Sequence, residues 1–281
     1  MDTSNYLWHF CEWSGALSRM RVPRQSPHNL YLHEALRCGA ALHAIAGDAA
    51  DAKRYTEAAD ALKAAFDRHF WDERETRYCV SRPGADTEAE GYEHIQVVAL
   101  ANGLVPEARK AGLLAKLKAE ALHPLGLNAA NYLVAACRGN GPQWRQYLYG
   151  RLRDVYDAIA LTGTTSLWET RTGGDDFGQA GSLCHGWSSI MPYYCRRVML
   201  GVWPLEPGFR RFEVRPYPSG LPRASGEIPT PSGPIRVSWE QQADGLHVIC
   251  RHPAALQAES AQYEEAPVAS FTDLPDGTAV R

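Results

Sequence analysis

The chain has 281 residues, which is enough for one large domain or two domains of modest size. Its apolar content of 45% and charged content of 22% are ordinary for a globular protein, and the net charge of −3 comes from acidic and basic residues mixed along the chain. Without a basic stripe a nucleic-acid partner is not expected, and without a long apolar run neither is a membrane span.

The cysteines and the N-terminus bear on the compartment. The seven cysteines are scattered and form no CxxC pair, which favours free thiols in a reducing compartment. The first residues lack the basic and apolar regions of a signal peptide, so the cytoplasm is the expected location. No cofactor or metal is expected, because the histidines lack metal-ligand spacing and the glycine-rich stretches lack the pattern of a phosphate loop.

Hydrophobic periodicity predicts helices joined in hairpins over the first two thirds of the chain. Residues 1–27 form an irregular, aromatic-rich segment. The first helix ends at Gly47, and Asp48 is placed to cap the second. A short extended piece is predicted near 78–80. The predicted helices cover about 29–46, 49–70, 92–103, 107–119, 127–138, 143–160 and 186–200, the last bent or begun late by Pro192.

The pattern then changes to short alternating runs with turn signals between them. Residues 211–215, 235–239 and 246–250 are predicted as antiparallel strands of a small β-sandwich. From Ala254 onward the sequence is rich in Ala, Glu and Pro, and a loose edge or tail is expected. The predicted fold class is therefore mainly α with an all-β C-terminal domain, divided into residues 1–203 and 204–281.

A long loop over 161–181 carries the residues that indicate chemistry. Glu169 follows Trp168 and a run of small hydroxyl residues, and His185 and Trp187 open the next helical segment. Aromatic faces stack on sugar C–H bonds, short polar groups bind hydroxyls, and a carboxylate serves acid–base catalysis. This inventory is typical of a sugar site.

Each of these residues also has a structural interpretation. Glu169 can pair with nearby Arg171, and His185 can be a satisfied structural histidine. Trp187 is about equally a core residue or part of a sugar platform. Adjacent residues in extended chain point opposite ways, so Trp168 is favoured as an anchor for the loop over a face of the pocket.

The order of these motifs resembles one family. The blocks Thr164-Thr-x-Leu-Trp-Glu169, Ser182-Leu-x-His-Gly-Trp187, Gly201-Val-Trp-Pro-Leu-Glu-Pro-Gly208 and Phe212-Glu-Val-Arg-Pro216 resemble the C-terminal half of bacterial α-L-rhamnosidases, glycoside hydrolase family 78. The resemblance implies a partial (α/α)6 six-hairpin barrel followed by a β-sandwich. It implies an inverting glycosidase that removes terminal α-L-rhamnose, with Glu169 as general base and His185 in contact with substrate.

The N-terminal motif Phe10-Cys-Glu-Trp13 carries part of the same resemblance. It implies that Trp13 contributes an indole to the rhamnose pocket, although packing under the first helix is the simpler interpretation. Glu12 matches an acidic position of the motif, with its role open. The family usually has an aromatic residue where Cys11 stands.

One segment of the family's pattern has no match here. The resemblance implies that the general acid and several sugar-binding carboxylates and arginines precede the part that this chain matches, and Met1–Trp13 contains no such segment. We therefore expect an N-terminally incomplete version of the enzyme. Glu12 is the nearest candidate for the acid within the chain, and a second copy or an upstream half-barrel partner is expected to complete the barrel.

Two other functions remain open at this point. The chain can be a non-catalytic carbohydrate-binding or assembly remnant of the same fold, which differs from the enzyme in whether an acid lies within reach of Glu169. The barrel can also serve another sugar, as in glucuronyl or trehalose hydrolases. The expected ligand in the favoured interpretation is a rhamnose-containing glycoside or oligosaccharide.

Overall fold

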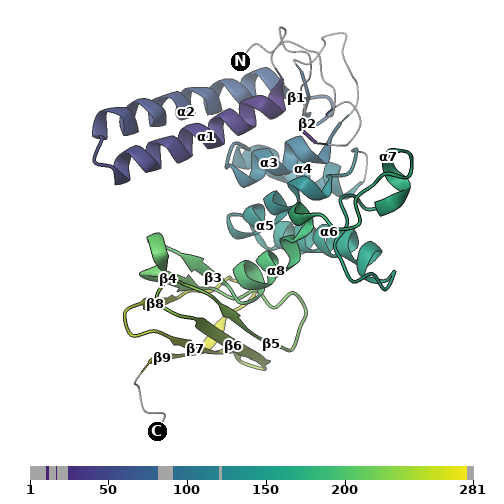
Figure 1. Cartoon of the computed structure of the whole chain (residues 1–281). Helices are drawn as coiled ribbons and strands as arrows, with labels where there is room; N and C mark the ends of the chain where they lie inside the picture. The colour runs from purple at the N-terminus through teal and green to yellow at the C-terminus, as the bar shows by residue number, and fades with distance from the viewer. Residues whose placement is uncertain (1–10, 13–16, 18–24, 82–90, 120–121, 277–281) are drawn as a thin grey trace. The chain divides into compact units, whose positions relative to one another are not determined.

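The computed structural model describes residues 11–12, 17, 25–81, 91–119 and 122–276 (Figure 1). The chain divides into two compact units. Unit 1 comprises residues 1–139 and 168–184, and unit 2 comprises residues 140–167 and 185–281. The predicted domain division between 203 and 204 stays a prediction.

Unit 1 begins with the antiparallel helix pair α1 (Ser26–Ile45) and α2 (Ala49–Phe70), drawn in purple and blue in Figure 1. The turn between them follows from its sequence. Gly47 adopts a φ of +81°, which a glycine tolerates without strain. Asp48 then caps α2, because its Oδ1 accepts a hydrogen bond from the Asp51 N–H at 3.1 Å. The predicted hairpin is confirmed.

The rest of unit 1 includes one helix that is buried along most of its length. A two-strand turn, β1 (Trp71–Asp72) and β2 (Arg77–Tyr78), leads to α3 (Glu93–Ala101), and α4 (Glu107–Lys118) and α5 (Asn131–Arg138) follow. Every residue of α3 from Glu93 to Leu100 is buried. The Gln96 side chain accepts from the Tyr78 N–H at 2.9 Å and donates to the Tyr78 carbonyl at 2.8 Å, which joins α3 to β2.

Unit 2 starts with α6 (Pro142–Ala160) and continues after the loop with the short helix α8 (Ile190–Tyr194). The single helix predicted over 186–200 is instead a 3-10 turn, α8 and a π turn over Cys195–Met199. Pro192 lies within α8, where it has no N–H to donate. Tyr156 of α6 donates its hydroxyl proton to the Ser188 carbonyl, which joins the two segments.

The C-terminal part of unit 2 is a β-sandwich. One sheet has the order β3–β4–β8, and the other has the order β5–β6–β7–β9. Both sheets contribute side chains to one core that includes Phe212, Val237 and Trp239. The strands are β3 (Val202–Pro204), β4 (Arg211–Val214), β5 (Arg223–Ile228), β6 (Ile235–Gln242), β7 (Gly245–His252), β8 (Gln257–Ser260) and β9 (Val268–Pro275).

The segment after Ala254, expected to be a loose edge or tail, contains two strands. β8 pairs parallel with β4, and β9 pairs parallel with β7. Parallel pairing uses partners far along the chain, so the local alternation that marks a hairpin is absent. Among the described residues, no helix has both the length and the apolar character needed to cross a membrane.

An ion pair joins α6 to the loop before β9 within unit 2. The buried Arg145 guanidinium donates through Nε and Nη2 to the two carboxylate oxygens of Glu265, with the Nη2–Oε2 distance 2.7 Å. The guanidinium also lies 4.1 Å from the ring centroid of Tyr263. A bidentate pair of this kind is stronger than a neutral hydrogen bond and fixes orientation.

Replacing Arg145 with alanine is expected to lower the free energy of unfolding by about 2 kcal/mol, because it removes two charge-assisted hydrogen bonds and the contact with Tyr263. Urea denaturation at neutral pH measures this. Arg236→Ala is the matched control, since its partner Glu227 lies 2.8 Å away and both side chains are more than half exposed, and it should cost about 0.5 kcal/mol or less. Equal losses in the two variants would contradict the role given to Arg145.

The same pair predicts a pH dependence. Burial alone raises the pKa of the Glu265 carboxyl, but the hydrogen bonds and charge of Arg145 outweigh it and the pKa lies below its ordinary 4.5. A carboxyl with a lowered folded-state pKa stabilises the fold above its unfolded pKa, and that contribution is lost as the pH falls through the folded value. The difference between wild type and Arg145→Ala should be constant from pH 7 to 5 and shrink below about 4.5.

Candidate functional site

The loop that carries Glu169 is closed by two hydrogen bonds to Ser182. The Glu169 N–H donates to the Ser182 carbonyl at 2.8 Å, and the Ser182 N–H donates to Glu169 Oε2 at 3.3 Å. The Glu169 side chain is half-buried. The backbone of the returning loop segment therefore contributes to the direction of this carboxylate, as a catalytic base requires.

Two glycines allow the loop to close this tightly. A Cβ atom on Gly181 would lie 1.8 Å from the carbonyl oxygen of Gly173, which no side chain permits. Gly173 itself adopts a φ of +59°, and the ring of Trp168 packs directly over its Cα. Trp168 is thus in contact with the loop backbone, which supports its role as an anchor.

The tip of the loop holds an unusual backbone conformation. The Thr172 hydroxyl donates to Asp176 Oδ2 at 2.5 Å. The next residues, Phe177, Gly178 and Gln179, have φ values of 54°, 69° and 73°, three left-handed residues in succession. Non-glycine residues in this region cost on the order of 1 kcal/mol each, and such conformations cluster at functional loops.

His185 and Trp187 form a second group, and they belong to unit 2. Their rings stack with centroids 3.9 Å apart and planes 23° apart. The His185 N–H donates to the Leu167 carbonyl at 2.8 Å, and Ser188 is held by Tyr156 of α6. Both rings are half-buried. The stack presents the aromatic and imidazole surface that a sugar contact needs.

Glu12 lies in the interior of unit 1. Its side chain is 0% exposed, and its Oε2 accepts from the Gly126 N–H at 2.9 Å and contacts His94 Nδ1 at 3.0 Å. Burial prevents direct contact with a ligand in solution. Its partner His94, which also contacts the Tyr31 hydroxyl, was not found by sequence reasoning, because His94 lies 82 residues from Glu12 and no local motif joins them. Trp13, the predicted pocket indole, falls outside the described residues.

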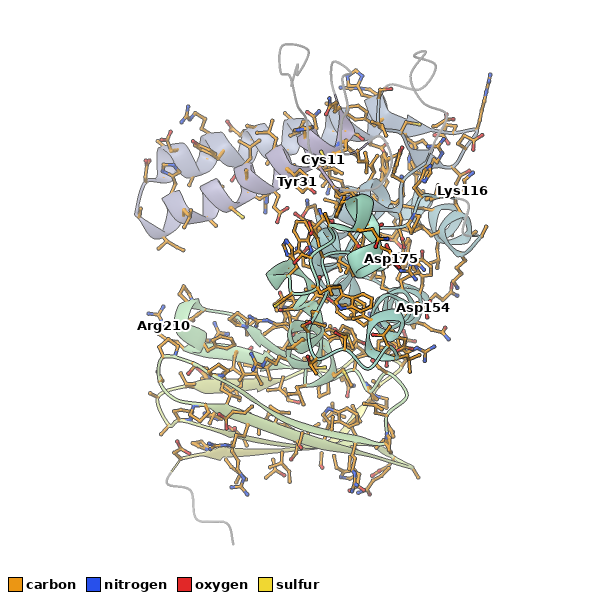
Figure 2. The ribbon with its side chains drawn as sticks, turned by 45° about the vertical axis from the view of Figure 1, so that its right-hand side comes forward. Cys11, Tyr31, Lys116, Asp154, Asp175 and Arg210 are labelled. Atoms are coloured by element: carbon orange, nitrogen blue, oxygen red, sulfur yellow. The ribbon has the colours of Figure 1, made fainter. Side chains whose placement is uncertain are left out.

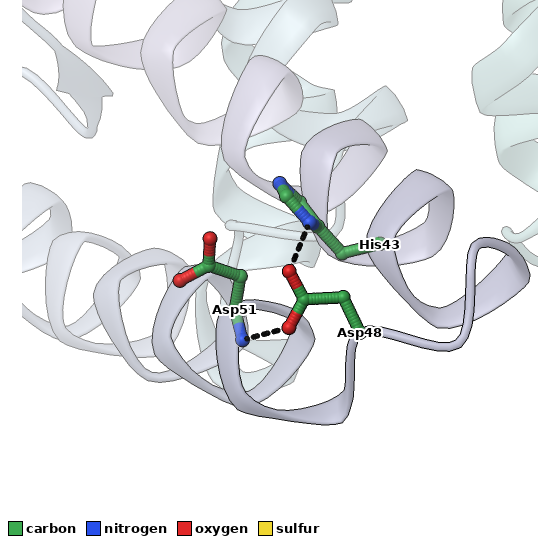
Figure 3. Close-up of side chains that lie close together, drawn as sticks. All are labelled: His43, Asp48 and Asp51. Carbon is green, nitrogen blue, oxygen red and sulfur yellow. Dashed lines mark hydrogen bonds and ion pairs between the residues drawn. The ribbon is translucent and has the colours of Figure 1, made fainter.

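A group of possible metal ligands occurs at the α1–α2 turn, where His43, Asp48 and Asp51 come together (Figure 3). Asp48 uses Oδ1 to cap α2 and Oδ2 to contact His43 Nδ1 at 3.2 Å. The hydrogen bond from the Asp51 N–H is the main cause of the lowered pKa of the Asp48 carboxyl. Helix capping therefore accounts for this arrangement.

Helical hairpins in unit 1 and a C-terminal β-sandwich in unit 2 define the class of the fold. Residues 6–198 match the model of the bacterial alpha-L-rhamnosidase 6 hairpin glycosidase domain, and residues 201–260 match that of the bacterial alpha-L-rhamnosidase C-terminal domain. The chain belongs to the bacterial α-L-rhamnosidase family, as its motifs predicted.

Individual relatives agree with this assignment. An α-L-rhamnosidase of Alteromonas sp. (strain LOR) is 36% identical over 101 residues, covering 35% of this chain and 11% of the relative. The GH78 rhamnosidase of Bacillus sp. GL1 superposes with a TM-score of 0.78 at 25% identity, covering 92% of this chain and 28% of that one.

A Streptomyces avermitilis α-L-rhamnosidase solved with L-rhamnose has a TM-score of 0.66 at 21% identity and shares the fold, covering 84% of this chain. This chain spans 28% or less of the length of each relative named here.

Replacing Gly181 with alanine is expected to open the loop, because the new Cβ would overlap the Gly173 carbonyl. The amides of Glu169 and Ser182 should then exchange faster with deuterium, as mass spectrometry of loop peptides would record. Gly174→Ala is the matched control in the same loop, since a Cβ on Gly174 would lie 3.7 Å from the nearest side-chain atom. Unchanged exchange in Gly181→Ala would contradict the close approach.

Proposed function

We propose that the chain carries the general base and part of the sugar pocket of an inverting α-L-rhamnosidase, acting on terminal α-L-rhamnose of a glycoside or oligosaccharide. Glu169 is the base that activates water. The observation that carries the proposal is the closure of its loop, since the Ser182 backbone holds the carboxylate in a half-buried setting. Family membership supports the substrate class.

His185 and Trp187 are proposed to bind the sugar. Their stacked rings offer an aromatic face and a hydrogen-bonding imidazole within one turn. Trp168 holds the loop in place, as its packing on Gly173 supports. Trp13 is proposed to add a further indole, on the strength of its motif alone.

An inverting glycosidase also needs a general acid, about 6.5–9.5 Å from the base. Glu12 is poorly suited to donate a proton to a leaving group, because its carboxylate is fully buried and one oxygen already faces two donors. We propose that the acid comes from chain outside these 281 residues, which make up only 28% or less of the length of the relatives.

The direct test is release of an aryl alcohol from an aryl α-L-rhamnoside by the purified chain. A good leaving group needs little help from an acid, so this substrate isolates the contribution of the base. Glu169→Gln should reduce turnover by about 10²–10⁴-fold, the usual contribution of positioned proton transfer. Proton NMR of the first sugar released should show the inverted β anomer.

Asp175→Asn is the matched control, because Asp175 is an exposed carboxylate of the same loop (Figure 2) and the change removes the same charge. It should leave turnover unchanged. If the folded wild-type chain binds a rhamnoside without hydrolysing it, the alternative function gains support, namely a carbohydrate-binding or assembly remnant of the same fold.

Completion of the barrel by further helices is a second part of the proposal. Leu42 and Ile45, near the end of α1, are 66% and 72% exposed, and burying such side chains is worth about 1.5–3 kcal/mol each. We propose that this face of the α1–α2 pair meets another helical segment, supplied by more of the barrel or by a second copy.

The isolated chain is therefore expected to self-associate in analytical ultracentrifugation, and the double variant Leu42→Ser, Ile45→Ser should shift it toward monomer. Leu161→Ser is the control, since Leu161 is 85% exposed in unit 2. A wild-type chain that stays a monodisperse monomer and unfolds cooperatively would exclude this part of the proposal.

A further inference from the structure

Three hydrogen-bonded side chains connect the interior of unit 1 to its surface. Glu12 Oε2 lies 3.0 Å from His94 Nδ1, and His94 Nε2 lies 2.9 Å from the Tyr31 hydroxyl. The glutamate and the histidine are fully buried, whereas Tyr31 is half-buried. Tyr31 is thus the accessible end of a carboxylate–imidazole–phenol series that the proposed mechanism does not use.

The hydrogen-bond directions in this series follow from the backbone. The Gly126 N–H can only donate, and it points at Glu12 Oε2 from 2.9 Å, so that oxygen is an acceptor. With Glu12 as a carboxylate, we assign the shared proton to His94 Nδ1. With a neutral imidazole, Nε2 is the acceptor and the Tyr31 hydroxyl is the donor. The lone pairs of the Tyr31 oxygen remain available to accept from a ligand.

Protonation of the phenol agrees with this direction. Burial is the largest cause that raises the pKa of Tyr31, and the neighbouring Cys11, Tyr132, Glu12 and Glu34 raise it further. Figure 2 shows Cys11 and Tyr31 next to each other at this end of unit 1. The hydroxyl therefore keeps its proton and directs it to His94.

A second tyrosine, Tyr132, lies beside Tyr31, and its hydroxyl also donates to a side chain of the protein. The rings of Tyr31 and Tyr132 are 6.2 Å apart, and the Tyr132 hydroxyl donates to Glu34 Oε2 at 2.7 Å. Glu34 and Tyr132 are half-buried. Glu34 is three residues after Tyr31 in α1, which puts both on one face of the helix. Each tyrosine hydroxyl thus donates its proton to another side chain of the protein, and its oxygen can accept a hydrogen bond from a ligand.

We propose that Tyr31, Tyr132 and Glu34 form a subsite that accepts hydrogen bonds from the hydroxyl groups of a neutral sugar, with Glu12 and His94 as positioning residues for Tyr31. This inference rests on the proposed function and deepens it. A ligand that brings several O–H donors matches a surface that offers acceptors. A phosphate or carboxylate would meet the Glu34 charge and find no donor in these three side chains.

A bound divalent cation fits less well. Ca²⁺ takes about six to eight oxygen ligands and favours several carboxylates. Here one carboxylate oxygen already accepts from Tyr132, and the tyrosine oxygens are neutral. A sugar needs only single hydrogen bonds and can place C–H groups against the two rings.

The test is a calorimetric titration of the full chain with methyl α-L-rhamnoside. Tyr31→Phe keeps the ring and removes the acceptor, so its affinity should fall about five- to tenfold, the value of one neutral hydrogen bond. Tyr132→Phe should have a similar effect. Tyr78→Phe is the matched control in the same unit, because the Tyr78 hydroxyl also donates to a carboxylate, Asp67 Oδ1 at 2.8 Å, but the residue is fully buried.

A double-mutant cycle tests the positioning role of His94. His94→Gln alone should weaken binding several-fold, and it should have no further effect in the Tyr31→Phe background, since it acts through the Tyr31 hydroxyl. A merely structural role would give the same loss in both backgrounds. Thermal unfolding of each variant identifies any that fails to fold, and the conservative tyrosine variants then decide alone.

The outcomes separate this inference from the proposed function. Binding and hydrolysis by wild type, with equal affinity in Tyr31→Phe, Tyr132→Phe and Tyr78→Phe, would overturn the subsite and leave the proposed function standing. Binding that weakens in Tyr31→Phe, together with no release of the aryl alcohol from the aryl α-L-rhamnoside, would support the subsite and contradict the glycosidase. A folded wild-type chain that binds no rhamnoside would overturn both.

Discussion

The candidate catalytic loop depends on one close approach of the backbone to itself, where Gly181 passes the carbonyl of Gly173. Any side chain at Gly181 would separate the two segments of the loop. The approach brings Ser182 opposite Glu169, so that a residue 13 positions later holds the carboxylate. The ring of Trp168 packs against Gly173. The Glu169 carboxylate is thus positioned by the geometry of its own loop.

A second constraint is the polar interior of unit 1. Helix α3 is buried along most of its length, yet three of its first four residues, Glu93, His94 and Gln96, are polar. Each has a defined partner in a neighbouring segment: the Leu125 N–H for Glu93, Glu12 for His94 and the Tyr78 backbone for Gln96. Buried polar groups that lose their partners are costly, so such a network favours one arrangement of the surrounding loops over others.

The sequence predicted what local patterns encode. The hairpin of α1 and α2, the capping role of Asp48 and the central strands β6 and β7 follow from periodicity and turn chemistry, and all are confirmed. Strands β8 and β9 did not show in the pattern, because each pairs parallel with a distant strand. The position of Glu169 in a loop was predictable, but its bond to Ser182 and the series from Glu12 to Tyr31 depend on tertiary contacts.

The burial of Glu12 changes what the N-terminal motif means for the chemistry. An acid that protonates a leaving group must reach the substrate, whereas the Glu12 carboxylate is fully buried and contacts His94 and the Gly126 N–H. Its negative charge is useful there because it fixes which nitrogen of His94 carries the proton, and hence which way the Tyr31 hydroxyl points. In the proposed subsite, the motif contributes to sugar binding through His94 and Tyr31. On this argument the base and the sugar contacts can reside in this chain while proton donation to the leaving group requires residues outside it.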